Sequence, residues 1–168
     1  MTKLKSIEKF AAFQQKRKKA NDSKATTVII SSGTCGQACG SLSVIDAFKK
    51  GLRKQKLENK IKLRVTGCHG FCEQGPLMVI EPGNIFYCHV TPDDAHDIVT
   101  RTLRDGEIIE RLLYTDPVSG HKIQTESEIP FYLAQDCQLL SRNREVNPCP
   151  IEDYIAGGAS SSAYNNRT

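Results

Sequence analysis

Four cysteines in two similar loops are the residues of this chain whose types and spacing could do chemistry. Cys35 and Cys39 lie in one loop, and Cys68 and Cys72 lie in the other, with three residues between the members of each pair. Each loop follows a segment whose composition predicts a β-strand. Thiolates are ligands for zinc and for iron–sulfur clusters. Four thiols in two loops therefore predict one metal site built from these cysteines.

Glycines surround both cysteine pairs. They are Gly33, Gly36 and Gly40 around the first pair and Gly67, Gly70 and Gly75 around the second. Cysteine loops that hold an iron–sulfur cluster direct backbone N–H groups towards the sulfurs, and glycine allows the positive φ angles and close backbone approach that such loops need. The pattern favours a [2Fe–2S] site.

Other interpretations of the two pairs stay open at this level. A structural zinc site also accepts two to four residues between its ligands, so the spacing does not exclude zinc. A thioredoxin-type dithiol is disfavoured, because it has two residues between its cysteines and a helix directly after them. The remaining alternative is that the cysteines are small buried residues with no ligand role.

The remaining cysteines and one histidine are weaker candidates. Cys88 lies in a strand pattern and is interpreted as a packing residue, while Cys137 and Cys149 have no partner at ligand spacing. His69 lies between the second pair, but a Rieske-type site requires two histidines. We expect His69 to be a solvent-facing loop residue.

The composition is that of an ordinary globular chain of 168 residues, with 39% hydrophobic residues, 25% charged residues and a net charge of +4. No apolar run approaches the roughly 20 residues that span a bilayer. We therefore expect a cytoplasmic protein without direct membrane insertion, in which clustered cysteines are metal ligands rather than disulfides. The basic run at residues 16–19 is interpreted as a solvated helix end, and no aromatic-studded basic strand indicates a nucleic-acid partner.

Hydrophobic periodicity predicts the elements that must position the loops. In chain order they are a helix over 4–19, a strand over 26–30, a helix from about 41 to 59, a strand over 60–65, a hairpin of strands 77–80 and 85–87, and a helix over 91–106. This is the order of a thioredoxin-like α/β domain, with a central mixed sheet of about four strands and flanking helices. We assign this domain to residues 1–107.

The rest of the chain predicts an irregular C-terminal appendage. Residues 108–158 mix turns with one possible strand within 131–140 and a short helix at 151–155. They contain too few apolar residues for a second core of their own. Residues 159–168 are small and polar, and we expect a disordered tail.

Three stretches resemble a known family. GTCGQA at 33–38, TGCHGFCEQGP at 66–76 and YCHVTPDD at 87–94 are similar to the thioredoxin-like [2Fe–2S] domain at the N-terminus of NADH-binding flavoprotein subunits. Such subunits occur in NADH dehydrogenase (complex I), NAD-linked hydrogenases and formate dehydrogenases. Residues 113–117, 129–132 and 151–155 resemble the lead-in to the FMN domain, so residues 108–158 are expected to be such a lead-in segment.

The resemblance implies an electron-transfer module that exchanges single electrons through a [2Fe–2S] cluster. The family ligand positions that this chain matches are Cys35, Cys68 and Cys72. The fourth position departs from the pattern, because the related first pair has four or more intervening residues and Cys39 leaves only three. Some family members place this thiol upstream, where the chain has Ser31 or Ser32.

The resemblance also implies partners. The glycine-rich loop for FMN and NADH would follow residue 158, so we expect this chain to bind neither FMN nor NAD alone and not to be a complete enzyme. The expected partners are flavoprotein or other iron–sulfur subunits of an NADH-linked oxidoreductase. The alternative is a structural or adaptor domain that keeps the fold without the cluster and docks on a partner oxidoreductase.

Overall fold

The computed structural model describes residues 6–21, 25–136 and 141–156, which divide into two compact units. The smaller unit contains helix α1 (Ile7–Asn21) and helix α6 (Ile151–Ala156), joined by a hydrogen bond from Gln14 Nε2 to the carbonyl of Ile155 at 3.0 Å. The short helix expected at 151–155 is confirmed. None of the described helices combines the length and apolar character needed to cross a bilayer. Cys137 and the expected disordered tail lie outside the described residues.

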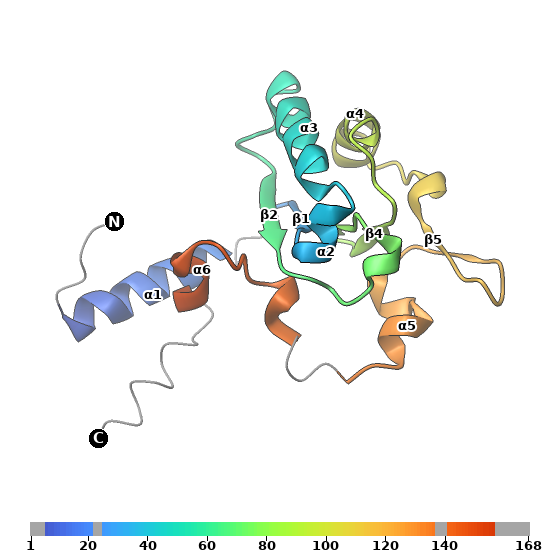
Figure 1. The fold of residues 1–168 in the computed structure, drawn as a ribbon. Coiled ribbons are helices and arrows are strands. Elements are labelled where there is room, and N and C mark those ends of the chain that lie inside the picture. Colours follow the sequence, from blue (N-terminus) through green and yellow to red (C-terminus); the bar gives the residue numbers. More distant parts are fainter. Residues whose placement is uncertain (1–5, 22–24, 137–140, 157–168) are drawn as a thin grey trace. The chain divides into compact units, whose positions relative to one another are not determined.

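The larger unit, residues 25–145, is built on a four-stranded sheet (Figure 1). Its strands are β1 (Thr27–Ser31), β2 (Lys62–Thr66), β3 (Met78–Glu81) and β4 (Ile85–Tyr87), in the spatial order β2-β1-β3-β4. β1 runs parallel to β2 and antiparallel to β3, and β3 is antiparallel to β4. The predicted mixed α/β sheet is confirmed.

Helices cover one face of this sheet. Helix α3 (Ser41–Lys54) and helix α4 (Asp94–Asp97), which continues as a π-helical segment over Ile98–Arg104, lie side by side there (Figure 1). Because successive strand residues point to opposite faces, Val28 and Ile30 of β1 face these helices. The helical contribution to this core is Val44, Ile45, Phe48, Leu52, Ala95, Ile98 and Val99.

The appendage covers the opposite face. Ile29, Val79 and Phe86 point to this side and form a second core, together with residues that follow the predicted domain: Tyr114, Ile129 and Tyr132. Helix α5 (Pro130–Leu133) carries the last of these. The strand expected within 131–140 is therefore wrong over the described residues, because Pro130 opens a helical turn at a position where proline is favoured.

The appendage also pairs with the outer edge of the sheet. Phe86 N donates to the carbonyl of Gln124 and Cys88 N donates to the carbonyl of Leu112, both at 2.8 Å. The appendage has its own short hairpin of β5 (Tyr114–Thr115) and β6 (Lys122–Ile123). Backbone groups of an edge strand need partners or solvent, and here the appendage supplies them.

One helix was not predicted, and the end of another differs from the prediction. The first cysteine loop contains helix α2 (Thr34–Ala38). Helix α3 ends at Lys54 rather than near residue 59, because Lys56 adopts a φ of 55° and Leu57 N bonds back to the carbonyl of Leu52 at 2.9 Å. This six-to-one hydrogen bond after a left-handed residue is the Schellman ending of a helix.

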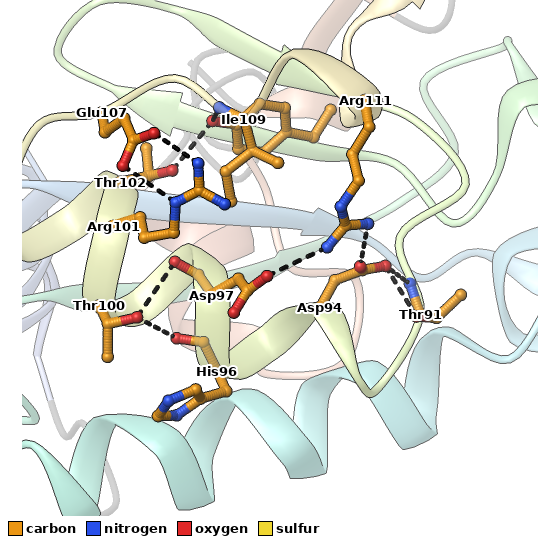
Figure 2. Close-up of polar contacts among 11 residues, drawn as sticks. Thr91, Asp94, His96, Asp97, Thr100, Arg101, Thr102, Glu107, Ile109 and Arg111 are labelled. Carbon is orange, nitrogen blue, oxygen red and sulfur yellow. Dashed lines mark hydrogen bonds and ion pairs between the residues drawn. The ribbon is translucent and has the colours of Figure 1, made fainter.

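An ion-pair network ties the start of α4 to the appendage (Figure 2). The carboxylate of Asp94 accepts hydrogen bonds from Thr91 N at 2.8 Å and Thr91 Oγ1 at 2.7 Å, and it pairs with Arg111. Arg111 also reaches Asp97 at 3.3 Å. Burial acts to raise the pKa of Asp94, but the hydrogen bonds from Thr91 and Arg111 outweigh it and hold this pKa below its usual range.

This network predicts a pH-dependent contribution to stability. Because the folded pKa of Asp94 lies below the ordinary 3.8, the stabilisation is fully present above that value and is lost as the pH falls through the folded pKa. We expect Asp94→Asn to lower the free energy of unfolding by about 1–3 kcal/mol at pH 7. The difference from the wild type should shrink in acid, measured by urea denaturation at several pH values. Asp93→Asn, at an exposed neighbour, is the control; an equal loss there would contradict the assignment.

Candidate metal centre

The two cysteine loops leave the same edge of the sheet. β1 and β2 are adjacent and parallel, and their last residues, Ser31 and Thr66, are paired. The loops are also hydrogen-bonded to each other, since Ser32 N donates to the carbonyl of Thr66 at 3.0 Å and Ser31 Oγ donates to the carbonyl of Gly67 at 3.1 Å. Parallel pairing therefore brings together cysteines that are 29 to 37 residues apart in the chain.

The first pair brackets α2, with Cys35 in its first turn and Cys39 as its C-cap. Cys39 N donates to the carbonyl of Cys35 at 2.9 Å, so the two residues are one helical turn apart. Residues at this spacing share a helix face, with about 5–6 Å between their Cβ atoms. Both cysteines are exposed. The short helix thus presents the two thiols together at the surface.

The second pair is less exposed than the first. The sulfurs of Cys68 and Cys72 are 3.3 Å apart, and Gly70 N, in the turn between them, donates to Cys68 Sγ at 3.3 Å. Gly70 has a φ of +89°, which a residue with a side chain rarely adopts. An amide directed at a cysteine sulfur is the feature that stabilises thiolate ligands of iron–sulfur clusters.

Close backbone approach joins the two pairs. A Cβ atom on Gly33 would lie 3.0 Å from Cys68 N and 3.2 Å from Cys68 Cβ, so a side chain there would displace the second loop. The pKa of Cys72 is raised by its hydrogen bond with Cys68, by burial and by a hydrogen bond with Cys35. Cys39 Sγ is 3.8 Å from the position that a Cβ on Gly75 would take, and so it also faces the second loop.

The four predicted ligands therefore meet as two pairs. No group of three His, Cys, Asp or Glu side chains in the described part of the chain is arranged to hold a single ion. A two-iron cluster shares its four cysteines between two metals, and two neighbouring pairs of soft thiolates are compatible with it, as they are with a Cys₄ zinc site. The donor set fits a [2Fe–2S] cluster, and the assignment of all four ligands stays a prediction.

Ser31, rather than Ser32, lies beside the second pair. Ser31 lines a cavity of about 10 Å³ together with Cys68 and Cys72. The hydroxyl of Ser32 is buried against Ser41 Oγ at 2.8 Å. A thiol at position 31 would thus reach the same site. Some family members are expected to carry the fourth thiol at Ser31 or Ser32.

The expectation of a solvent-facing His69 is wrong. Its side chain is 1% exposed, and its Nε2 is 2.9 Å from Thr66 Oγ1. Its Nδ1 lies 3.6 Å from Glu126 Oε1, on the appendage. Local sequence gives no sign of this partner, because it is more than 50 residues away.

The other described cysteines lie outside the site. Cys88 is buried in the second core, as the strand pattern indicated, and burial raises the pKa of its thiol to about 12. Cys149 is exposed and belongs to the smaller unit. All six described cysteines are free thiols.

Sequence comparison identifies the family. Residues 2–103 match the family model of the thioredoxin-like [2Fe-2S] ferredoxin, so the chain belongs to this family. It is 35% identical over 72 residues to a 2Fe-2S ferredoxin of Clostridium pasteurianum, covering 43% of this chain and 71% of the relative. It is also 35% identical over 82 residues to a 2Fe-2S ferredoxin of Aquifex aeolicus (strain VF5), covering 48% and 73% respectively.

Comparison with solved structures gives the same fold. The wild-type thioredoxin-like [2Fe-2S] ferredoxin from Aquifex aeolicus superimposes with a TM-score of 0.51 at 26% sequence identity, covering 56% of this chain and 100% of that chain. A second structure of a thioredoxin-like [2Fe-2S] ferredoxin from this organism gives 0.51 at 24% identity, covering 60% and 100%. The appendage after residue 103 lies outside the family match.

Close packing around α2 predicts that a side chain at Gly36 destabilises the fold. A Cβ atom at this position would lie 2.7 Å from the carbonyl oxygen of Ser31, so α2 would have to move away from the end of β1. We expect Gly36→Ala to lower the free energy of unfolding by about 1–3 kcal/mol, measured by urea denaturation. Gly51→Ala in α3 is the matched control, since its Cβ would meet Val99 Cγ2 at an ordinary 3.4 Å. Equal stability of the two variants would contradict this packing.

Proposed function

We propose that this chain carries a [2Fe–2S] cluster on Cys35, Cys39, Cys68 and Cys72 and transfers single electrons through it. The observation that carries the proposal is the meeting of two thiol pairs at the carboxyl ends of two parallel strands, β1 and β2. Membership of the thioredoxin-like [2Fe-2S] ferredoxin family supports it. The curated relatives bear the name 2Fe-2S ferredoxin.

The bound cluster would supply the one-electron chemistry, and the protein would supply ligands, hydrogen bonds and partial burial. The Gly70 amide at Cys68 Sγ would stabilise negative charge on that sulfur. Cys68 and Cys72 are half-buried, whereas Cys35 and Cys39 are exposed. Electrons would therefore enter and leave on the side of α2, where a redox partner can approach.

Cys39 is our choice for the fourth ligand. It shares a face of α2 with Cys35 and its sulfur lies against the Gly75 end of the second loop. Ser31 is the competing position, because it lines the small cavity beside Cys68 and Cys72. Thiolate is the better ligand for iron, and the Ser31 hydroxyl is engaged by the carbonyl of Gly67.

The proposed setting is an NADH dehydrogenase-type oxidoreductase. The resemblance of residues 108–158 to the lead-in of an FMN domain supports this setting, with flavoprotein or other iron–sulfur subunits as partners and FMN and NAD bound by them. We propose a cytoplasmic location, which is supported by the free thiols of the six cysteines that the structure describes, because such thiols persist in a reducing compartment.

A second candidate is a cluster-free adaptor domain that docks on such an oxidoreductase. Its supporting observation is Ser31, which stands beside the second pair where some relatives would carry a thiol. Under this function the fold alone would be used, and the cysteine pairs would hold no iron.

Anaerobic purification followed by iron and sulfide analysis, visible absorption and EPR tests the proposal. We expect two irons and two sulfides per chain, as a [2Fe–2S] cluster requires, and an EPR signal on reduction. Cys68→Ala and Cys39→Ala should each lose most of the iron, whereas the control Cys149→Ala should keep it. An iron-free wild type would support the adaptor function, and stoichiometric zinc would show a structural metal site. Retention of the cluster in Cys39→Ala and its loss in Ser31→Ala would make Ser31 the fourth ligand.

A further inference from the structure

The appendage contacts the second cysteine loop through both non-glycine residues that lie between its cysteines. These residues are His69 and Phe71. His69 faces Glu126, and Phe71 packs among aromatic rings of residues 114–132. The family match ends at residue 103, so these partners lie beyond the part of the chain that defines the family.

A buried polar chain begins at His69. Its Nε2 lies 2.9 Å from Thr66 Oγ1, and its Nδ1 lies 3.6 Å from Glu126 Oε1. Thr66 Oγ1 also lies 3.5 Å from the carbonyl of Ile30, to which its hydroxyl can donate, so either partner of the contact between Nε2 and Thr66 can be the donor. Arg144 pairs with the other oxygen of Glu126 at 3.1 Å. Glu126 is thus held between the loop and a cation.

Three buried polar atoms of this region, one of them in the carboxylate itself, are left without a partner. They are His69 Nδ1, Glu126 Oε1 and Tyr132 Oη, none of which has a hydrogen-bond partner among the described residues. Burial, and then the negative charge of Glu126, raise the pKa of Tyr132. The guanidinium of Arg144, which pairs with Glu126, lies 4.3 Å from the centre of the Tyr132 ring.

An aromatic cluster holds the other end of the loop. The ring of Phe71 stacks on Phe131 with centroids 4.1 Å apart. It also meets the edge of Tyr132 at 5.7 Å and the tilted ring of Tyr114 at 5.4 Å. Phe71 is 8% exposed, and aromatic pairs of this kind add to the stabilisation that burial provides. The loop is therefore fixed by an apolar contact next to Cys72 and a polar contact next to Cys68.

We propose that Glu126, oriented by Arg144, is a positioning residue for the second cysteine pair. Its contact with His69 fixes the peptide that follows Cys68, and so sets the direction of the Cys68 sulfur relative to Cys72. Partners behind metal ligands act in this way in other sites, where their loss typically costs 10–100-fold in metal affinity. The appendage is then a part of the metal centre. The expected effect of Glu126 on iron binding rests on the proposed function. Its expected effect on the second cysteine loop does not.

Hydrogen exchange on cluster-free protein tests the effect on the loop. We expect Glu126→Ala to speed exchange of the amides of residues 67–73 by about tenfold, because the opening of a local segment is controlled by its own contacts. Amides of β1 should be unchanged. Glu128→Ala is the matched control, since it removes the same charge from the same turn at an exposed position. Equal exchange in the two variants, or equal acceleration in β1, would overturn the proposal.

Glu126→Gln keeps a hydrogen-bond acceptor on a side chain of the same length. It therefore separates loss of the contact with His69 from a general loss of structure. Because the amide oxygen can still accept from His69 Nδ1, we expect this variant to recover most of the loop protection. Exchange as fast as in Glu126→Ala would show that the contact with His69 is not what holds the loop.

Reconstituted protein then tests the effect on the metal centre. When the cluster is loaded and a chelator is added, the visible absorption of Glu126→Ala should decay about tenfold faster than that of Glu128→Ala. The EPR g values of Glu126→Ala should also differ. Altered loop exchange without iron uptake in any variant, the wild type included, would support the loop contact and refute the proposed function. Unchanged chelation rates and g values in loaded Glu126→Ala would overturn the positioning role.

Discussion

The parallel register of β1 and β2 is the constraint on which the site depends. It pairs Ser31 with Thr66, so the two loops begin side by side at one edge of the sheet. The site requires the two loops to approach closely at this edge, and Gly33 permits this because it has no side chain to meet the Cys68 backbone. A shift of one residue in this register would also turn the buried side chains of β1 to the opposite face. Core packing and the position of the thiols are therefore fixed by the same pairing.

The sheet has two apolar faces, and different parts of the chain cover them. Helices α3 and α4, which lie within the family match, cover one face. The appendage covers the other face through Ile129 and Tyr132 and also pairs with the edge of β4. A residue that stabilises the second core, Phe71, lies inside the second cysteine loop. Fold stability and loop geometry are thus linked through the appendage.

Sequence patterns predicted the elements near the site well, because each depends on local periodicity. The strand before Cys35, the alternating strand before Cys68 and the hairpin of β3 and β4 are all present. The environment of His69 could not be predicted, since its partner Glu126 is distant in sequence and lies in a segment with weak patterning. The helix at Pro130 was missed for a similar reason: four residues are too few to show a helical period. The domain limits at residues 107 and 158 remain a prediction. The appendage packs on the sheet and pairs with its edge, so residues on both sides of position 107 share one core.

The most direct measurement for the central claim is a crystal structure of the anaerobically purified protein with anomalous scattering recorded at the iron absorption edge. The account predicts two adjacent iron atoms at the edge formed by β1 and β2, bound by the sulfurs of Cys35, Cys39, Cys68 and Cys72. An iron-free site, a single zinc ion bound by the four thiols, or irons bound elsewhere in the chain would contradict it.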